Sequence, residues 1–263
     1  MKKSSSVKTV DRLVSILDCF SPQRRTWSLA ELSGHLGLPK STLHRFLVSL
    51  ESHGILRRDS DDKRWRLGYR LCIWGDLAAQ STGLRHIALP VMHGLLDNTK
   101  ETVILTVYQD GEVVCIERVE TSHPVRLAFD VGTRRPPHAG ASSKILMAYL
   151  PEEEIHSIIC DKGLPRLCEN TITDPSLLMA ELARIRELGY AVSREETDVG
   201  AWGVATPIRG REGDVVAAIG VAGPLSRFGE DLLRHYAARC RQAADRISQE
   251  LGGGDGGSGV VTE

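Results

Sequence analysis

Two short helix-forming segments joined by a glycine turn constrain what the first third of this 263-residue chain can fold into. The first segment opens with Ser28-Leu-Ala-Glu31, which fits a capping box in which the serine and the glutamate satisfy free N–H groups at a helix start. Gly37 supplies the left-handed turn that ends this helix. A second helix is predicted from about 39 to 53, because Pro39 is tolerated in a first helical turn. The pair predicts a helix-turn-helix.

Apolar residues at three- and four-residue spacing predict one inward face on each helix of this region. A preceding helix is expected at residues 7–20, where the serine before Pro22 stops it. Residues 55–67 follow the second helix of the pair as two strand-like pieces around a polar turn at 60–62, which predicts a β-hairpin or wing. The expected inward residues are Val7, Val10, Leu13, Val14, Leu17, Phe20, Leu29, Leu32, Leu36, Leu43, Phe46, Leu47 and Leu50.

Polar residues at the start of the second helix and along the hairpin are the candidates for DNA contact. In a helix-turn-helix the second helix enters the major groove by its N-terminal end. Arg45 is the candidate for reading guanine, since its guanidinium matches O6 and N7. Basic residues of the hairpin are expected along the phosphate backbone, where they add affinity without sequence information. The predicted DNA-binding set is Ser28, Lys40, Ser41, Thr42, His44, Arg45, Arg58, Lys63 and Arg64.

The charge of the chain is divided unevenly along its length. Residues 1–75 hold 14 Lys and Arg against 7 Asp and Glu, a balance of +7, whereas the remainder holds 19 basic and 27 acidic residues, a balance of −8. A basic end joined to an acidic body suggests that the first segment alone meets a polyanion. Three-helix units with a hairpin also serve as protein-interaction modules, but the charge and the predicted wing together favour DNA.

Short segments in three blocks follow one another in the order of a known family. They are Ser6-Val-Lys-Thr-Val-Asp-Arg-Leu13 with residues 29–45, Pro137-His-Ala-Gly-Ala-Ser-Ser-Lys144, and Gly189-Tyr-Ala-Val-Ser-Arg-Glu-Glu196 with Gly200, Ala205-Thr-Pro-Ile208 and Ala218-Ile-Gly-Val-Ala-Gly-Pro224. In this order they resemble the IclR family of transcription regulators over about residues 6–250. The resemblance implies a winged helix-turn-helix, a linker helix, a GAF-like effector domain, and dimers, often paired into tetramers, on palindromic operator DNA.

The predicted fold class is α+β, because the second part of the chain carries strands paired by hairpins with helices at both ends. Asp110-Gly111 between two β-rich runs is a strong hairpin signal. Helices are expected at 84–99, 139–150, 177–188 and 226–251, and strands at 102–108, 113–119, 191–193, 203–207 and 215–221. The predicted organisation is a winged helix-turn-helix domain at 1–67, a linker helix at 68–83, a GAF-like effector-binding and oligomerisation domain at 84–251, and a flexible tail at 252–263.

The resemblance also implies where an effector binds: between the sheet, the loop before residue 139, and the loop between 193 and 203. The start of the helix near Gly140 would offer free N–H groups, which suit a carboxylate. The alternative is that the small residues there only permit close packing. The predicted effector-binding residues are Leu127, Phe129, Gly140, Ala141, Ser142, Met147, Ser193, Trp202, Gly203, Gly220 and Ala222, with Leu146 as a further apolar candidate.

Pocket chemistry departs from one pattern within the family. Members specialised for small polar acids place Asp, Cys, Ser and Ser where this chain has Ser193, Gly203, Gly220 and Ala222. That exchange enlarges the cavity and removes hydrogen-bonding groups, so a bulkier ligand would gain by burying apolar surface, at about 25 cal/mol per Å². The prediction is a regulator of a catabolic operon, with repression favoured, that responds to an aromatic or otherwise bulky organic acid.

The sequence gives less support to two other functional classes. An enzyme carried on a DNA-binding domain has little support, because the chain contains no GxSxG, HExxH or GxxxxGK[ST]. Glu195 and Glu196 are adjacent and are expected to hold the loop at 197–200. A non-specific DNA-coating protein would not need an acidic-leaning second domain built around a cavity.

The cysteine spacing and the distribution of apolar residues indicate which cofactors and which cellular compartment to expect. The six cysteines are scattered singly, without metal-ligand spacing, so neither a metal nor another cofactor is expected. No apolar run approaches the roughly 18 residues of a membrane span. The first residues lack the apolar stretch of a secretory signal. A cytoplasmic protein is therefore expected.

Overall fold

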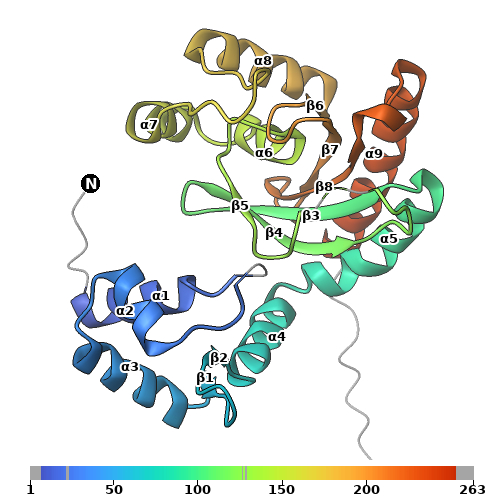
Figure 1. The fold of residues 1–263 in the computed structure, drawn as a ribbon. Helices are drawn as coiled ribbons and strands as arrows, with labels where there is room; N and C mark the ends of the chain where they lie inside the picture. The colour runs from blue at the N-terminus through green and yellow to red at the C-terminus, as the bar shows by residue number, and fades with distance from the viewer. Residues whose placement is uncertain (1–6, 22–23, 126, 128, 253–263) are drawn as a thin grey trace, which may run out of the picture. The chain divides into compact units, whose positions relative to one another are not determined.

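The computed structural model describes residues 7–21, 24–125, 127 and 129–252 (Figure 1). The chain divides into two compact units, Met1–Ser81 and Thr82–Glu263. The predicted linker helix is present as α4 (Arg70–Thr82), which ends at the division between the units. The tail predicted at 252–263 lies outside the described residues, apart from Gly252 at the end of the last helix.

The first unit is a helical cluster with a small hairpin. Its elements are α1 (Lys8–Asp18), α2 (Leu29–Leu36), α3 (Lys40–Ser52), β1 (Leu56–Arg58), β2 (Trp65–Leu67) and α4. Leu32 and Leu43 are fully buried where α2 meets α3. Trp65 of β2 exchanges two backbone hydrogen bonds with Trp27, at 3.1 and 2.7 Å, which attaches the hairpin to the chain just before α2. The predicted helices and wing are therefore confirmed.

The prediction of an inward face on α1 was partly wrong. Val7, Val10 and Val14 are 62%, 54% and 50% exposed, whereas Ile16, which was not predicted, is fully buried. The helix packs on the rest of its unit through the side that carries Ile16, together with partly buried leucines. The spacing correctly predicted a helix. It did not predict which side is buried, because α1 has apolar residues on two sides and the neighbouring helices cover one of them.

The second unit contains one six-stranded antiparallel sheet and the helices that cover it. Its elements are α5 (Leu84–Thr99), β3 (Thr102–Gln109), β4 (Glu112–Val119), β5 (Arg134–Arg135), α6 (Ala141–Ala148), α7 (Glu152–Lys162), α8 (Pro175–Leu188), β6 (Ala191–Arg194), β7 (Ala201–Arg209), β8 (Val215–Pro224), the 3₁₀ turn η1 (Leu225–Arg227) and α9 (Glu230–Gly252). The strand order is β5-β4-β3-β8-β7-β6. Asp110 and Gly111 both have positive φ in the β3–β4 turn, as the hairpin prediction required.

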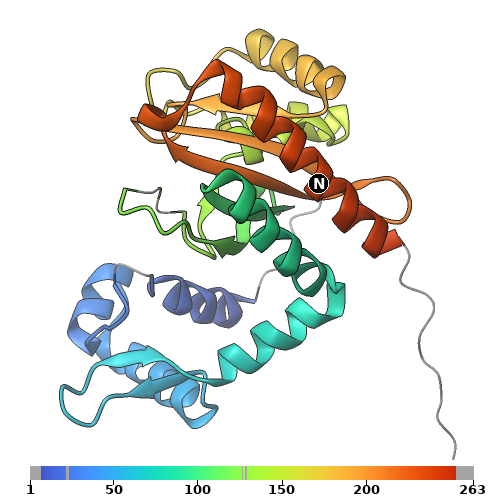
Figure 2. The same ribbon diagram turned by 90° about the vertical axis from the view of Figure 1, so that its right-hand side faces the viewer.

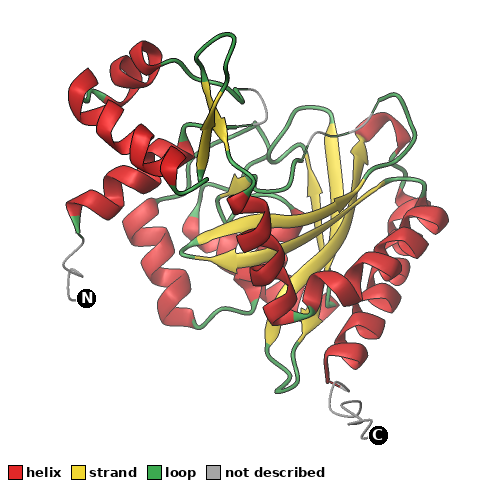
Figure 3. Cartoon of the chain, turned by 90° about the horizontal axis from the view of Figure 1, so that it is seen from below, coloured by secondary structure: helices red, strands yellow, loops and turns green. Residues whose placement is uncertain are grey.

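Helices pack on both faces of this sheet. Because side chains alternate along a strand, Val204 of β7 belongs to the core beneath α5 and α9, whereas its neighbour Ala205 belongs to the core beneath α6 and α8. Figure 2 shows the long α9 lying along one face, and Figure 3 shows the strands in yellow with red helices on either side of them. The α6 face is the one that carries the cavity described below.

Several elements differ from the sequence-based expectation. The helix predicted at 139–150 is shorter, and Pro151 occupies the N-cap position of a second helix, α7, which was not predicted. Three consecutive glutamates, at 152–154, follow that proline, and acidic side chains stabilise the positive end of a helix dipole. The two-residue β5 was not predicted, since so short a strand exists only through its pairing with β4.

Candidate DNA-binding surface and effector pocket

The helix-turn-helix is fixed by local hydrogen bonds. Ser28 Oγ accepts from the Glu31 N–H at 3.3 Å, and a carboxylate oxygen of Glu31 accepts from the Ser28 N–H at 2.8 Å, which completes the predicted capping box. Gly37 ends α2 with φ of 64°, and the Ser33 hydroxyl donates to the Leu38 carbonyl oxygen at 2.6 Å across the turn. These contacts set the direction in which α3 leaves α2.

The start of α3 presents the predicted recognition residues on its outer side. Lys40, Ser41, His44 and Arg45 are exposed, and Thr42 is half-buried. The buried residue of this stretch, Leu43, packs into the core of the unit. The polar side chains are thus grouped on one exposed surface at the N-terminal end of the second helix, where a major groove would be met.

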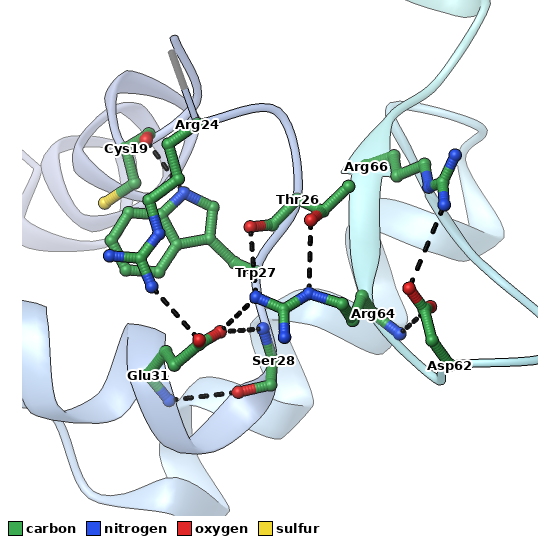
Figure 4. A network of polar contacts seen from close by, with 9 residues as sticks. All are labelled: Cys19, Arg24, Thr26, Trp27, Ser28, Glu31, Asp62, Arg64 and Arg66. Carbon is green, nitrogen blue, oxygen red and sulfur yellow. Dashed lines mark hydrogen bonds and ion pairs between the residues drawn. The ribbon is translucent and has the colours of Figure 1, made fainter.

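Two of the predicted DNA contacts, Ser28 and Arg64, have roles within the unit. Arg64 donates to Glu31 Oε2 at 2.6 Å and to Thr26 Oγ1 at 3.1 Å, so it connects the hairpin to the start of α2 (Figure 4). Ser28 is occupied in the capping box. In the hairpin, Arg58 and Lys63 are exposed, and Arg58 Nε donates to the Lys63 carbonyl oxygen at 3.2 Å.

Glu31 is the centre of this network, and the sequence indicated only its part in the cap. The backbone N–H of Ser28 and the Arg64 guanidinium lower the pKa of Glu31 to about 2. Arg24 adds a second ion pair, at 3.2 Å, and its guanidinium lies 3.3 Å from the centre of the Trp27 ring. Two arginines far apart in the sequence therefore share one carboxylate at the beginning of α2 (Figure 4).

The second unit contains a cavity of about 200 Å³ on the sheet face that α6 covers. Residues of β3, β5, β6, β7 and β8 line it together with the start of α6 and the loop between β6 and β7. Its described lining consists of Ile104, Leu127, Phe129, Arg135, Ala139, Gly140, Ala141, Ser142, Ser143, Ser193, Thr197, Asp198, Ala201, Trp202, Gly203, Val221 and Ala222.

Nine of the eleven predicted effector residues border this cavity, and two do not. Met147 is fully buried in the core beneath α6 and α8, as is its neighbour Leu146, so both are packing residues. At Gly220 a Cβ would lie 2.6 Å from the Val204 carbonyl oxygen, which shows that this glycine permits the close approach of β7 and β8. Neither Met147 nor Gly220 therefore borders this cavity, because position along a helix or strand does not by itself separate cavity from core.

Trp202 borders the cavity, but its ring does not fill it. The indole stacks on Tyr236 of α9, with ring centres 5.0 Å apart and planes within 13°. It also packs on Phe228 at 4.9 Å. Because Trp202 alternates with Ala201 and Gly203 along β7, its side chain lies on the opposite face of the sheet. The small neighbours, rather than the tryptophan, face the cavity.

One N–H group at the start of α6 already binds a carboxylate of this chain. The N–H of Gly140, predicted to be free, donates to Glu196 Oε2 at 3.0 Å. The other oxygen of Glu196 accepts from Lys144 Nζ at 2.7 Å, and Lys144 also pairs with Glu181 at 2.9 Å. Gly140 has φ of 94°, and a Cβ there would lie 3.2 Å from the Thr197 side chain. Glu196 therefore holds the β6–β7 loop against α6.

Glu195, the residue before Glu196, makes a hydrogen bond within the β6–β7 loop. Glu195 Oε1 accepts from the Gly200 N–H at 2.7 Å, which supports the prediction that this carboxylate pair holds residues 197–200. His138, which precedes the start of α6, is fully buried, and desolvation lowers its pKa. Its Nε2 lies 3.0 Å from the Pro165 carbonyl oxygen. The β6–β7 loop and the segment before α6, which both contribute to the cavity lining, are thus held by polar contacts within the chain.

The sequence reasoning missed several lining residues, including one ion pair. Arg135 Nη2 lies 2.9 and 3.2 Å from the two carboxylate oxygens of Asp198, and its guanidinium carbon lies 5.6 Å from the centre of the Phe129 ring. Arg135 directly precedes the Pro136-Pro137-His138 run, and this position next to the segment before α6 was the sequence signal that could have indicated a place in the cavity lining. The other missed residues are Ile104, Ala139, Ser143, Thr197, Ala201 and Val221.

Within the described ranges, no group of three or more His, Cys, Asp and Glu side chains is arranged to hold a metal ion. The six cysteines are all unpaired. None of the helices in the described part of the chain is long and apolar enough to cross a bilayer.

A helix-turn-helix unit with a hairpin, followed by an α+β unit with a cavity, defines the class of ligand-responsive DNA-binding transcription regulators. Family profiles identify the particular family: "IclR helix-turn-helix domain" matches residues 9–60, and "Bacterial transcriptional regulator IclR C-terminal" matches residues 77–249. The chain belongs to the IclR family.

Relatives match along almost their whole length. The HTH-type transcriptional regulator KipR of Bacillus subtilis is 34% identical, over 93% of this chain and 97% of the relative. The transcriptional repressor IclR of Escherichia coli is 29% identical, over 95% and 92% of the two chains. The crystal structure of an IclR homologue from Microbacterium hydrocarbonoxydans, complexed with 4-hydroxybenzoate, is 31% identical, with a TM-score of 0.83 over 92% and 98% of the chains.

Proposed function

We propose that this regulator is a repressor of a catabolic operon and that its effector is a single-ring aromatic acid bound in the cavity of the second unit. The size and lining of the cavity carry the proposal. An apolar cavity of roughly 150 Å³ holds benzene in a well-studied protein, and this one measures about 200 Å³. Ile104, Leu127 and Phe129 supply apolar contacts for a ring.

Small residues on the sheet leave the space that a ring would need. Gly203 and Ala222 border the cavity, and at Gly203 a Cβ would make only ordinary contacts, the nearest at 3.6 Å from the Ala141 side chain. Ser193 is the polar side chain that β6 contributes. The relative that binds 4-hydroxybenzoate supports an aromatic acid, and the repressor among the relatives supports repression.

The operator-bound form is proposed to be a homodimer, with tetramers as a further assembly, on palindromic DNA. The first unit carries apolar side chains that its own residues leave exposed: Val7 just before α1, Val10 and Val14 on α1, and Ile73 and Leu77, four residues apart on α4. Exposed apolar patches of this kind are typical of interfaces with another chain. In two copies related by a two-fold axis, each α3 helix would bind one half-site of the operator.

Signalling is proposed to pass through α4, which joins the two units. An effector can change DNA affinity only to the extent that it binds two arrangements of the protein with different affinity. Binding in the cavity would favour the arrangement with low operator affinity, and this would release the operon from repression.

The experiment starts with selection of duplexes from a random pool by the full-length protein. The selected duplex should bind at least about 10³-fold more tightly than a scrambled one. Addition of 4-hydroxybenzoate or benzoate should release it, and transcription in vitro from a promoter that overlaps it should be blocked by the protein and restored by the acid. Activation instead of blockage would exclude repression, and no effect of any aromatic acid would exclude the proposed effector class.

The competing hypothesis is an enzyme whose active site is the same cavity. We favour a binding site, because the relatives are transcription regulators and the charged pair of the lining, Arg135 and Asp198, neutralise each other. Incubation of the purified protein with each acid that binds, followed by chromatography, distinguishes the two. Any protein-dependent turnover would overturn this assignment.

A further inference from the structure

Arg135 and Asp198 are the charged residues of the cavity, and they come from opposite edges of the sheet. Among the described lining residues, Arg135 is the sole cation and Asp198 the sole anion. Arg135 lies on β5, one edge strand, and Asp198 lies in the loop after β6, the other edge strand. Their ion pair therefore links the two edges across the strands that line the cavity between them.

The guanidinium of Arg135 is only partly used in this pair. Both oxygens of Asp198 are reached by the same nitrogen, Nη2. Its Nε is buried and has no hydrogen-bond acceptor among the described residues. A guanidinium carries five N–H donors in a planar fork that matches a carboxylate with two parallel hydrogen bonds. Arg135 thus retains donor capacity for a second carboxylate.

Asp198 is a weak competitor for that donor capacity. Its side chain is 48% exposed, whereas the Arg135 side chain is 21% exposed. Release of a half-exposed carboxylate such as Asp198 costs little, because water solvates it when the pair opens. Glu195 and Glu196 hold the ends of the loop that carries Asp198, so the loop stays in place when the pair opens. Exchange of Asp198 for an incoming carboxylate therefore costs little.

At the start of α6 the Gly140 N–H already donates to Glu196, and Lys144 there is shared by Glu196 and Glu181. A ligand carboxylate at this point would add a third negative charge around one ammonium group. Arg135, by contrast, lies over the Phe129 ring, with its guanidinium carbon 5.6 Å from the ring centre, so an aromatic side chain stands beside its donors.

We propose that Arg135 is the specificity-determining residue of the cavity: it binds the carboxylate of the effector and gives up Asp198 in doing so. This inference rests on the proposed function, since it assigns a role within the same pocket, but it does not require the acid to be aromatic. It requires only that the cavity distinguishes an acid from its neutral counterpart through this one side chain.

The test measures binding to the full-length protein by titration calorimetry with benzoate, 4-hydroxybenzoate and hexanoate, each beside its amide. Hydrogen bonds to charged groups contribute about 1.5–3 kcal/mol, and tenfold in affinity is 1.4 kcal/mol. The wild type should therefore prefer at least one acid over its amide by about 10- to 100-fold. Arg135→Met should reduce that ratio to within about threefold while the amide still binds.

Two further variants sharpen the test. Arg134→Met is the matched control: Arg134 is the adjacent residue of β5, pairs with Glu112 at 3.1 Å and does not border the cavity, so the ratio should not change. Asp198→Asn removes the internal competitor and should tighten binding of the acid by about three- to tenfold, with the affinity for the amide unchanged. Unchanged or weaker acid binding in Asp198→Asn would refute the proposal that the effector carboxylate replaces Asp198 on Arg135.

The outcomes separate this inference from the proposed function. If an aromatic acid binds with the same preference in Arg135→Met, the role of Arg135 is refuted and the aromatic effector stands. If hexanoate binds through Arg135 and the aromatic acids do not bind, the role of Arg135 stands and the aromatic effector is refuted. If no acid is preferred over its amide by the wild type, the role of Arg135 is refuted.

Discussion

Removal of the Lys144 ammonium should destabilise the second unit more than most single substitutions. The side chain is 2% exposed, and Nζ lies 2.7 Å from Glu196 and 2.9 Å from Glu181. Lys144→Met keeps the length and much of the volume of the side chain while it deletes the charge. Glu196, whose side chain is 9% exposed, would then be a buried carboxylate that has lost its cation.

The expected magnitude follows from the surroundings of the two carboxylates. Breaking a buried ion pair by removing one partner typically costs about 3–5 kcal/mol. Here the lower end applies, because Glu196 keeps the Gly140 N–H at 3.0 Å and Glu181 keeps Arg184 at 3.5 Å. A loss of about 3 kcal/mol lowers Tm by roughly 6–12 °C in a domain of this size, at about 2–4 °C for each kcal/mol.

Urea unfolding and scanning calorimetry of the full-length protein measure the effect. Lys100→Met is the control, since the Lys100 side chain is 70% exposed and lies 3.9 Å from Asp97, so the loss should stay below about 1 kcal/mol. The double variant Lys144→Met with Glu196→Gln should recover part of the loss, because no buried carboxylate is left without its cation at position 196. A loss below about 1 kcal/mol in Lys144→Met would refute the reasoning.

Three other substitutions test the DNA surface, the cavity and the cap. Arg45→Ala should weaken operator binding by about 1–3 kcal/mol and relax selectivity at one base position, as measured by anisotropy titrations with operator variants; an unchanged preference at every position would exclude base reading by Arg45. Ala141→Trp should fill the cavity and abolish acid-induced release while DNA binding persists, and a normal response in the release assay would mean that the effector binds elsewhere. Glu31→Gln should flatten the acid-unfolding profile of the first unit. The pKa of Glu31 in the folded protein is about 2, below the ordinary 4.5. The ionised Glu31 side chain therefore stabilises the unit above pH 4.5, and this contribution is lost as the pH falls towards 2. Circular dichroism measures both profiles, and wild-type and Glu31→Gln profiles that coincide would contradict that role.

Features that depend on neighbouring residues were predictable from the order of amino acids. Ser28 and Glu31 satisfy each other within one turn, Gly37 supplies a left-handed backbone, and Asp110-Gly111 turns β3 into β4. Each of these depends on hydrogen bonds or dihedral angles within a few residues, so a few letters of sequence specify it. The balance of charge between the two parts of the chain is likewise independent of any fold.

Contacts between distant residues required the packed structure. Arg135 and Asp198 are 63 positions apart and meet because the sheet order brings its two edge strands around one cavity. Glu196 reaches the start of α6 across 56 positions, and in doing so it occupies the N–H of Gly140. Met147 lies in the core and Val7 in solvent for the same reason: periodicity identifies an apolar side of a helix, but only its packing partners determine whether that side meets a cavity, a core or solvent.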